Sequence, residues 1–318
     1  MSKCSIIIPN YNHANYLAQR INSILSQTYN NYELIILDDG SKDESLAVIE
    51  KYKTHAKVAH IIVNETNSGS PFHQWTKGIT LASGEWIWIA ESDDYAEPDF
   101  LETAFATIAK CPEAGIFYSD SIYNTDDGTP YRFKNSASFK NDYFQTKKWS
   151  DDYCITGTEE LNYFLKYICT IINASCTVIR KDKLLNIINN LKDFRYHGDW
   201  YCFIAIALNT NICYSSKPLN SCRMHQENFL NNIQKSQSKK EYFRILNLLV
   251  KNDVITDKRT LIDFFTLQFL GFGMIKDGSV HAVKIFRSYF SINRRLAFKV
   301  SAMLLWQKIT FRKRKTIY

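Results

Sequence analysis

Short apolar runs alternate with segments of helical periodicity through about the first ninety residues of the chain. Four runs rich in isoleucine, leucine, valine and aromatic residues predict buried strands, at residues 5–8, 32–37, 59–63 and 86–90. Apolar residues at helical spacing predict helices over residues 16–27 and 46–52. Strands that alternate with helices form βαβ units. The predicted fold class is therefore α/β, with a mostly parallel central sheet and flanking helices.

Acidic or polar clusters follow three of the four predicted strands, at residues 9–13, 38–41 and 91–94. Parallel strands share a direction, so the clusters should lie along one edge of the sheet, where open α/β sheets bind ligands. The last cluster, with sequence ESDD, brings together three carboxylates, which repel one another unless a cation or hydrogen-bond donors offset their charge. A hard divalent ion on the phosphates of a substrate would do so. The alternative is an acidic turn before the next helix, which Pro98 could open.

Four stretches of this half resemble the nucleotide-binding half of family-two inverting glycosyltransferases, of the kind that builds bacterial surface polysaccharides. They are residues 5–12 (SIIIPNYN), 21–28 (INSILSQT), 37–41 (LDDGS) and 84–94 (GEWIWIAESDD). The resemblance covers residues 4 to about 120 and rests on the order and spacing of the four stretches. It implies the GT-A fold, which is Rossmann-like, and a nucleotide diphosphate sugar as the donor.

The resemblance assigns the nucleobase to the ends of the first two predicted strands. Pro9 and Tyr11 are expected to line the base pocket, with Tyr11 offering a ring for stacking. Asp39 is expected to accept a hydrogen bond from the base, which fits the imide N–H of uracil and favours a UDP-linked donor. Asp38 is expected to support the same loop.

The resemblance assigns the ribose and the diphosphate to the ESDD cluster. Asp93 is expected to contact the ribose, and Asp94 to bind a Mn²⁺ or Mg²⁺ ion that bridges the diphosphate. Glu91 stands where relatives usually have aspartate, and it keeps the charge as a supporting acid on a longer side chain. Trp75 and Thr76 stand where many relatives have Arg-Asn, which removes an arginine contact and leaves Trp75 to pack against the sheet.

The second half of the chain should supply acceptor recognition and the catalytic base. Asp199 precedes an apolar stretch, and on local sequence alone it would cap the N-terminus of a helix. The resemblance favours Asp199 as the base that deprotonates the acceptor. Other acids are predicted to have structural roles, with Asp151 and Asp152 in a polar loop and Asp120 in a turn.

Arg223 and His225 are separated by one residue, which places both side chains on one face of an extended segment. Relatives often have a similar Arg-x-His near the end of the catalytic domain. Arg223 is therefore expected to contact a phosphate, and His225 to bind the metal or the diphosphate. The alternative is a surface strand with a basic face.

The cysteine pattern and the N-terminus predict a cytoplasmic protein. The eight cysteines are scattered without a Cys-x-x-Cys pair, and we expect them to be reduced. The chain opens directly into a strand rather than a signal peptide, and no apolar stretch is long enough to cross a bilayer.

The charge is divided unevenly along the chain. Residues 226–318 contain 18 Lys and Arg against 6 Asp and Glu, whereas the remainder contains 21 against 26. Residues 1–120 are predicted to form the nucleotide-sugar-binding half, 121–227 the acceptor-binding half and 228–318 a basic helical C-terminal region. Residues 279–318 mix basic and bulky apolar side chains, which predicts contact with an anionic membrane on its inner face. The alternative is a set of helices packed on the catalytic domain.

The function predicted is transfer of a hexose or N-acetylhexosamine, with inversion, to a hydroxyl of a saccharide or lipid-linked acceptor in surface polysaccharide or lipopolysaccharide assembly. One alternative is a degenerate member that binds nucleotide or acts as a membrane scaffold. Another is a nucleotidyltransferase, which would usually have a glycine-rich phosphate loop after the first strand. No motif indicates binding to nucleic acid.

Overall fold

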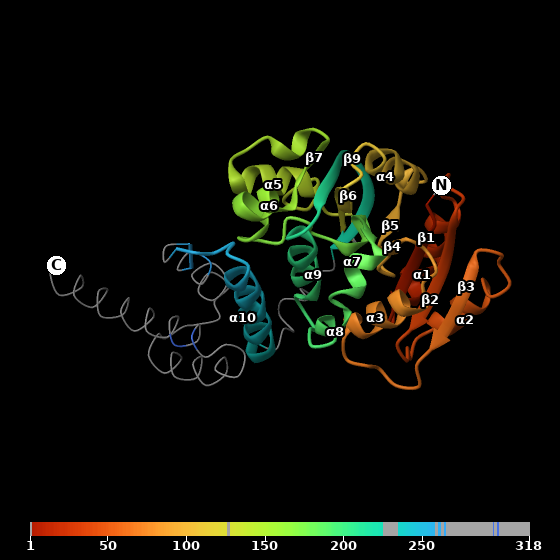
Figure 1. The fold of residues 1–318 in the computed structure, drawn as a ribbon. Helices are drawn as coiled ribbons and strands as arrows, with labels where there is room; N and C mark the ends of the chain where they lie inside the picture. The colour runs from red at the N-terminus through yellow and green to blue at the C-terminus, as the bar shows by residue number, and fades with distance from the viewer. Residues whose placement is uncertain are drawn as a thin grey trace. The chain divides into compact units, whose positions relative to one another are not determined.

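The computed structural model describes residues 2–125, 128–224, 235–257, 260, 261, 264, 295 and 298. Contacts between residues divide the chain into two units, residues 1–232 and 233–318. The first unit contains the central sheet, and the second contains helix α10, Lys235–Lys251 (Figure 1).

The described part of the first unit is built on a nine-stranded sheet with the order β3-β2-β1-β4-β8-β6-β9-β5, in which β7 also pairs with β9. The strands are β1 Cys4–Asn10, β2 Tyr32–Asp38, β3 Val58–Val63, β4 Trp86–Ile89, β5 Tyr95–Ala96, β6 Ala114–Thr125, β7 Tyr153–Thr156, β8 Thr177–Arg180 and β9 Asn211–Met224. The first four strands are parallel, and they are the four strands predicted from the sequence. β8 runs antiparallel between β4 and β6, and β6 pairs with β9 in parallel. The predicted α/β fold with a mostly parallel sheet is confirmed.

Helices cover both faces of the sheet (Figure 1). In the first unit they are α1 Ala14–Leu25, α2 Ser45–Glu50, α3 Pro71–Leu81, α4 Phe100–Ile108, α5 Ser136–Phe144, α6 Gly157–Glu160, α7 Lys181–Leu185, α8 Ile188–Leu191 and α9 Gly198–Ala207. Ile6 and Ile8 share one hydrophobic core with side chains of α1, α2 and α4. Ile7 points to the other face, where α3 lies so close that a Cβ atom on Gly78 would stand 2.5 Å from Ile7 Cγ2. The alternation of β1 side chains therefore fixes one helical layer on each face.

Asp120 is not in a turn, which corrects the prediction. It lies within β6, is buried, and accepts hydrogen bonds through Oδ1 from Ser136 Oγ at 2.6 Å and Ala137 N at 2.8 Å. These donors belong to the first turn of α5, where a carboxylate is favoured by the unsatisfied N–H groups. A buried acid at a helix N-terminus looks like a loop residue in the sequence because its partners lie 16 and 17 residues away.

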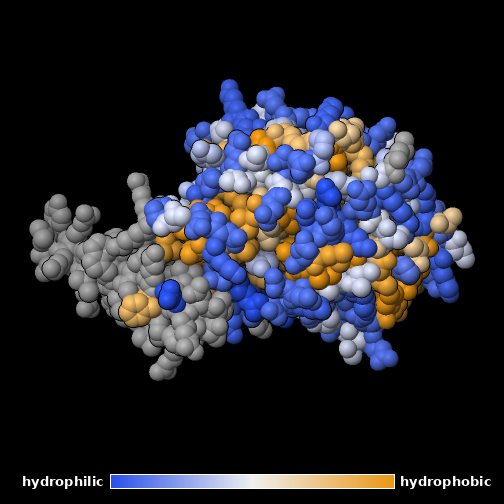
Figure 2. Space-filling view, viewed as in Figure 1, coloured by the Kyte–Doolittle hydropathy of each residue, from blue (hydrophilic) through white to orange (hydrophobic). Residues whose placement is uncertain are grey.

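None of the described helices is long and apolar enough to cross a membrane. On the face that Figure 2 shows, hydrophilic residues surround smaller hydrophobic patches. The segment expected to contact a membrane, residues 279–318, lies outside the described residues apart from 295 and 298, so membrane contact stays a prediction.

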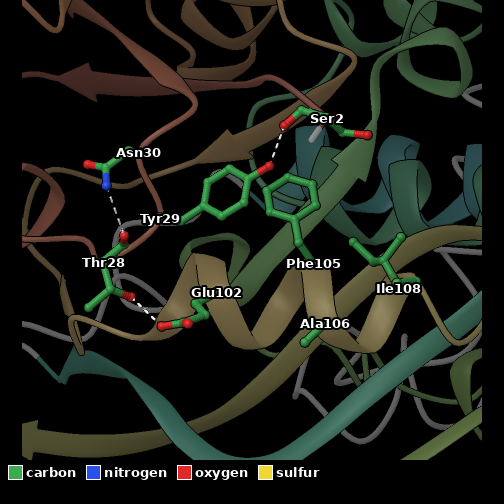
Figure 3. Close-up of a pocket in the computed structure, with 9 residues that line it drawn as sticks. Ser2, Thr28, Tyr29, Asn30, Glu102, Phe105, Ala106 and Ile108 are labelled. Carbon is green, nitrogen blue, oxygen red and sulfur yellow. Dashed lines mark hydrogen bonds between the residues drawn. The ribbon is translucent and has the colours of Figure 1, made fainter.

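A largely apolar cavity of about 500 Å³ lies beside α4 and the loop that follows α1. Tyr29 stacks on Phe105 with 4.5 Å between the ring centres, and its hydroxyl donates to the carbonyl oxygen of Ser2 (Figure 3). Glu102 is the acid among the lining residues, and it accepts a hydrogen bond from Thr28 Oγ1 at 2.7 Å. With a single hydrogen-bonded acid, this cavity lacks the clustered polar groups of a reactive site.

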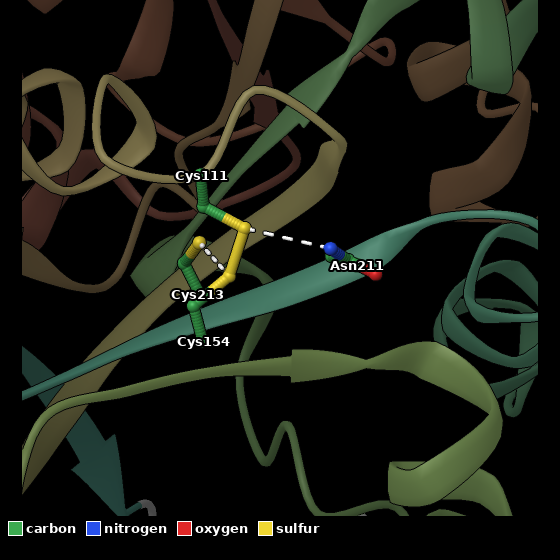
Figure 4. Close-up of a disulfide and its surroundings, with 4 residues drawn as sticks. All are labelled: Cys111, Cys154, Asn211 and Cys213. Atoms are coloured by element: carbon green, nitrogen blue, oxygen red, sulfur yellow. Dashed lines mark hydrogen bonds between the residues drawn. A yellow bond between two sulfur atoms is a disulfide. The ribbon is translucent and has the colours of Figure 1, made fainter.

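Cys111 and Cys154 form a disulfide, so the expectation that all eight cysteines are reduced is wrong (Figure 4). Cys111 follows α4 and Cys154 lies in β7, 43 residues further along the chain. Cys154 pairs with Cys213 of β9 in the sheet, and the Cys213 Sγ lies 3.2 Å from the Cys154 Sγ. The pairing of β7 with β9 places Cys154 beside Cys213, and no short-range motif in the sequence predicts the contact of Cys154 with Cys111.

Candidate active site

A cavity of about 570 Å³ opens at the carboxyl ends of β1, β2 and β4. All three polar clusters that follow these strands contribute to its lining, as the shared strand direction predicted. The remaining lining residues come from the loops around Asn67 and Asn173, from the first turns of α3, from Arg195 and Tyr196, and from the end of β9. The sheet edge therefore gathers acids, amides and basic groups from both halves of the first unit.

The loops after β1 and β2 form one wall of the cavity. Pro9, Tyr11 and Asp39 line it, and Tyr11 is 43% exposed, so its ring can offer a face for stacking. Gly40 has a φ of +76°, and a Cβ atom there would stand 2.9 Å from the Thr66 carbonyl carbon. Glycine is thus required where the Asp39 loop meets the loop after β3.

Asp38 and Asp39 have different surroundings. The buried carboxylate of Asp38 accepts from Asn10 Nδ2 at 2.7 Å, Ser41 N at 2.8 Å and Ser41 Oγ at 2.7 Å, so it ties the two loops together. Asp38 is not among the residues that line the cavity, which favours the supporting role expected for it over direct contact with nucleotide.

Asp39 faces the cavity and is held by four donor groups. Its Oδ1 accepts from Asn64 Nδ2 and Gln74 Nε2, both at 2.6 Å, and the Ser68 N–H is shared by both oxygens at 3.0 Å. Ser68 Oγ donates to Oδ2 at 2.7 Å. These bonds fix the carboxylate and the loop of residues 64–70 against each other.

The ESDD cluster forms the opposite wall, where Glu91, Asp93 and Asp94 all line the cavity. Burial, together with the charge of Asp93, raises the pKa of Glu91 to about 8 and that of Asp94 to about 6. The three carboxylates thus show the mutual repulsion inferred from the sequence. Hard oxygen ligands whose charges repel fit a divalent cation such as Mn²⁺ or Mg²⁺.

Asp94 is anchored to the second half of the unit. Its Oδ2 accepts from Asn173 Nδ2 at 2.7 Å, and its Oδ1 accepts from the backbone N–H of Arg223 at 3.0 Å. Each oxygen can accept a second partner, so binding to a metal remains open to it. Asp93 is half-buried, and its carbonyl oxygen accepts from Arg223 Nε at 2.9 Å.

Arg223 lies near the end of β9, on the extended segment that the sequence predicted. Its Nη2 donates to Gln19 Oε1 at 3.0 Å, and its guanidinium lies 4.3 Å from the Tyr16 ring centre. These contacts hold a cation beside Asp93 and Asp94 at the cavity wall. His225, expected to bind the metal, lies outside the described residues.

Asp199 occupies the first turn of α9, but it does not cap that helix. The N-cap is His197, and Asp199 Oδ1 accepts from the backbone N–H of Trp200 at 2.7 Å, so the capping alternative is wrong. Asp199 is half-buried and is not among the lining residues of the cavity, whereas Arg195 and Tyr196, just before it, are. The loop before α9 therefore reaches the cavity, and the role of Asp199 as the base stays a prediction.

Sequence reasoning identified Trp75 and Glu91 but missed the contact between them, and it missed residues of the site that lie in loops. Trp75 is buried as expected, and its Nε1 donates to Glu91 Oε1 at 3.0 Å, so the two departures from the family pattern contact each other. The occurrence of both departures in one sequence was the signal from which this contact could have been inferred. Asn173 and Tyr196 lie in irregular loops, where no periodicity marked them.

The chain belongs to glycosyl transferase family 2, whose sequence profile matches residues 5–188, more than half of its length. It is 30% identical over 135 residues to the glycosyltransferase GlyG of Streptococcus pneumoniae, covering 42% of this chain and 44% of that protein. It is also 36% identical over 112 residues to the poly(ribitol-phosphate) β-N-acetylglucosaminyltransferase TarS of Staphylococcus aureus, covering 34% of this chain and 19% of TarS. The match thus spans less than half the length of each of these relatives.

Two solved structures share the fold. S. aureus TarS 1–349 in complex with UDP-GlcNAc aligns with a TM-score of 0.66 at 19% identity, over 92% of this chain and 82% of that chain. The mannosyltransferase PcManGT of Pyrobaculum calidifontis in complex with GDP-Man and Mn²⁺ aligns with a TM-score of 0.53 at 13% identity, over 97% and 75%. At such identities the likeness concerns the fold alone, which is the GT-A fold that the sequence predicted.

Proposed function

We propose that the chain is an inverting glycosyltransferase that moves a hexose or N-acetylhexosamine from a UDP-linked donor to a hydroxyl of a bacterial surface polysaccharide. The observation that carries the proposal is the meeting of three features in one cavity. These are an exposed aromatic ring beside a fixed carboxylate, a cluster of acids, and an arginine at the end of β9. A nucleotide diphosphate sugar combines a nucleobase, a diphosphate and a sugar, and these groups match the features of the cavity.

The identity of the nucleobase is inferred from the cavity wall that carries Asp39 rather than from the fold. TarS was solved with UDP-GlcNAc and PcManGT with GDP-Man, so the shared architecture accommodates both bases. The Asp39 carboxylate suits the single imide donor of uracil, and the exposed ring of Tyr11 gives the base a stacking partner. The donor proposed is therefore a UDP-sugar.

The residues of the chain divide the work of a single displacement. Asp39 and Tyr11 hold the base, and the Arg223 guanidinium offsets the charge of the phosphates. Asp199 takes the proton of the acceptor hydroxyl as that oxygen attacks the anomeric carbon. Holding donor and acceptor together supplies much of the rate. Because the acceptor attacks directly, the anomeric configuration inverts and no nucleophilic side chain is needed.

In this proposal Asp94 would hold the divalent ion, with His225 as a further ligand and Glu91 as a supporting acid, and Asp93 would contact the ribose. When bound, Mn²⁺ or Mg²⁺ offsets the negative charge that grows on the leaving diphosphate.

Calorimetric titration of the full chain with UDP and with GDP, each with and without Mn²⁺, tests the proposal. We expect UDP to bind more tightly than GDP, and Mn²⁺ to strengthen the binding. Tighter binding of GDP would contradict the assignment of uracil to Asp39. Binding of neither nucleotide would contradict the proposed donor class.

A further inference from the structure

Arg20 lies in α1 with none of its side chain exposed, directly behind the ESDD cluster. Its Nε donates to the carbonyl oxygen of Glu91 at 2.8 Å, and its guanidinium lies 5.6 Å from the centre of the Trp88 ring. The Glu91 carbonyl also accepts the N–H of Asp94 at 3.3 Å. The same carbonyl thus closes the acidic turn and receives the arginine.

In the part of the chain that the structure describes, the rest of the guanidinium has no hydrogen-bond partner. Nη1 and Nη2 of Arg20 are both buried, and neither is bonded to any group in the described part of the chain. A buried cation without partners is strongly unfavourable unless nearby opposite charges compensate it. Burial lowers the pKa of Arg20, while the charges of Asp94, Asp93 and Glu91 act in the opposite direction.

The acids lie between this cation and the cavity. Glu91, Asp93 and Asp94 line the cavity, whereas Arg20 does not reach it. A ligand therefore meets the carboxylates, and the buried side of the acidic turn is backed by a positive charge. Neither propensity nor packing requires an arginine at this position, because an apolar residue would suit the buried face of α1 better.

We propose that Arg20 is a positioning residue, a fixed counter-charge that holds the acidic turn in its binding geometry when no cation or donor occupies the site. The inference rests on the proposed function, because that function has the acidic turn bind and release a divalent cation. Arg20 stabilises the turn in the absence of that ligand, and its like charge weakens the binding of a divalent cation. Without Arg20 the turn would depend on the cation for its order.

Two variants separate the charge of Arg20 from its guanidinium group. Arg20→Lys keeps a cation, and Arg20→Gln removes it, while both lose the guanidinium. Lys140→Gln is the matched control. Lys140 is also a buried cation, but it is surrounded by the rings of Tyr118, Trp149 and Tyr214 rather than by the ESDD cluster.

The measurement is the shift in melting temperature of the full chain on adding Mn²⁺ alone, with the Mn²⁺ dissociation constant obtained by calorimetry. We expect Arg20→Gln to bind Mn²⁺ on the order of tenfold more tightly than the wild type and to show a larger shift. Arg20→Lys and Lys140→Gln should respond like the wild type. With a wild type that binds Mn²⁺, an Arg20→Gln response equal to or smaller than that of the wild type would overturn the proposal.

Hydrogen exchange of residues 91–94 without metal gives a second, independent test. Faster exchange in Arg20→Gln than in Arg20→Lys and Lys140→Gln supports the counter-charge role, and equal exchange in all three overturns it. If the wild type does not bind Mn²⁺, the metal part of the proposed function fails, and the comparison of hydrogen exchange among the variants still decides the role of Arg20.

Discussion

Replacement of Asp39 by asparagine tests the wall that we assign to the nucleobase. The substitution keeps the size of the side chain and removes its charge. With the amide nitrogen at the Oδ1 position, it would face the amide donors of Asn64 and Gln74. The better orientation places the nitrogen at the Oδ2 position, where the Ser68 hydroxyl can turn and accept.

The expected loss of stability follows from the three hydrogen bonds that Oδ1 of residue 39 still accepts in this orientation. A hydrogen bond to a charged group contributes about 2 kcal/mol net, and one between neutral groups about 1 kcal/mol. Asp39→Asn should therefore lower the free energy of unfolding by about 3 kcal/mol. Its affinity for UDP should also fall by about 1–3 kcal/mol, because the imide N–H loses its charged acceptor.

Urea denaturation gives the first quantity and calorimetric titration with UDP gives the second. Asp182→Asn is a suitable control, since that carboxylate is half exposed and its ion pairs with Arg180 and Lys183 lie at the surface. Such pairs contribute about 0–1 kcal/mol. If Asp39→Asn were no more destabilising than the control, the four donors would not be holding the loop, and our reasoning about this wall would be refuted.

Three further results are expected. Asp199→Asn should bind UDP as the wild type does but lose transfer, and near-normal turnover would move the base to another acid such as Asp151 or Asp152. Cys111→Ser should lower the free energy of unfolding by about 4 kcal/mol, because the disulfide closes a loop with a sequence separation of 43 residues; wild-type stability that is unaffected by a reductant would contradict this. The full chain should co-sediment with anionic vesicles in a salt-sensitive manner, and truncation after Gly278 should abolish this binding. A full chain that does not co-sediment with such vesicles would refute membrane contact.

Local pattern was sufficient to predict the parallel half of the sheet. The runs that became β1 to β4 are short, β-prone and bounded by polar clusters, so their ends could be placed on one edge. This is why Tyr11, Asp39 and Asp94 meet in the cavity as expected. The supporting role expected for Asp38 came from the family resemblance rather than from this pattern.

The second half depends on contacts that sequence spacing does not encode. Asn173 binds Asp94 across 79 residues, and Arg223 binds it across 129 residues. Asp120 was misplaced because a buried acid that binds a helix N-terminus has the local sequence of a turn. Trp75 and Glu91 were each recognised as unusual, but the hydrogen bond that links them needed the placement of α3 beside the loop after β4.

Real-time NMR of donor turnover tests the central claim most directly. The full chain with Mn²⁺ would be given α-linked UDP-sugars, with water as the acceptor, and the anomeric proton of the released sugar would be followed before mutarotation. We expect the β-anomer to form first together with UDP, and Asp199→Asn to abolish its release. First formation of the α-anomer, or release that Asp199→Asn leaves unchanged, would contradict it.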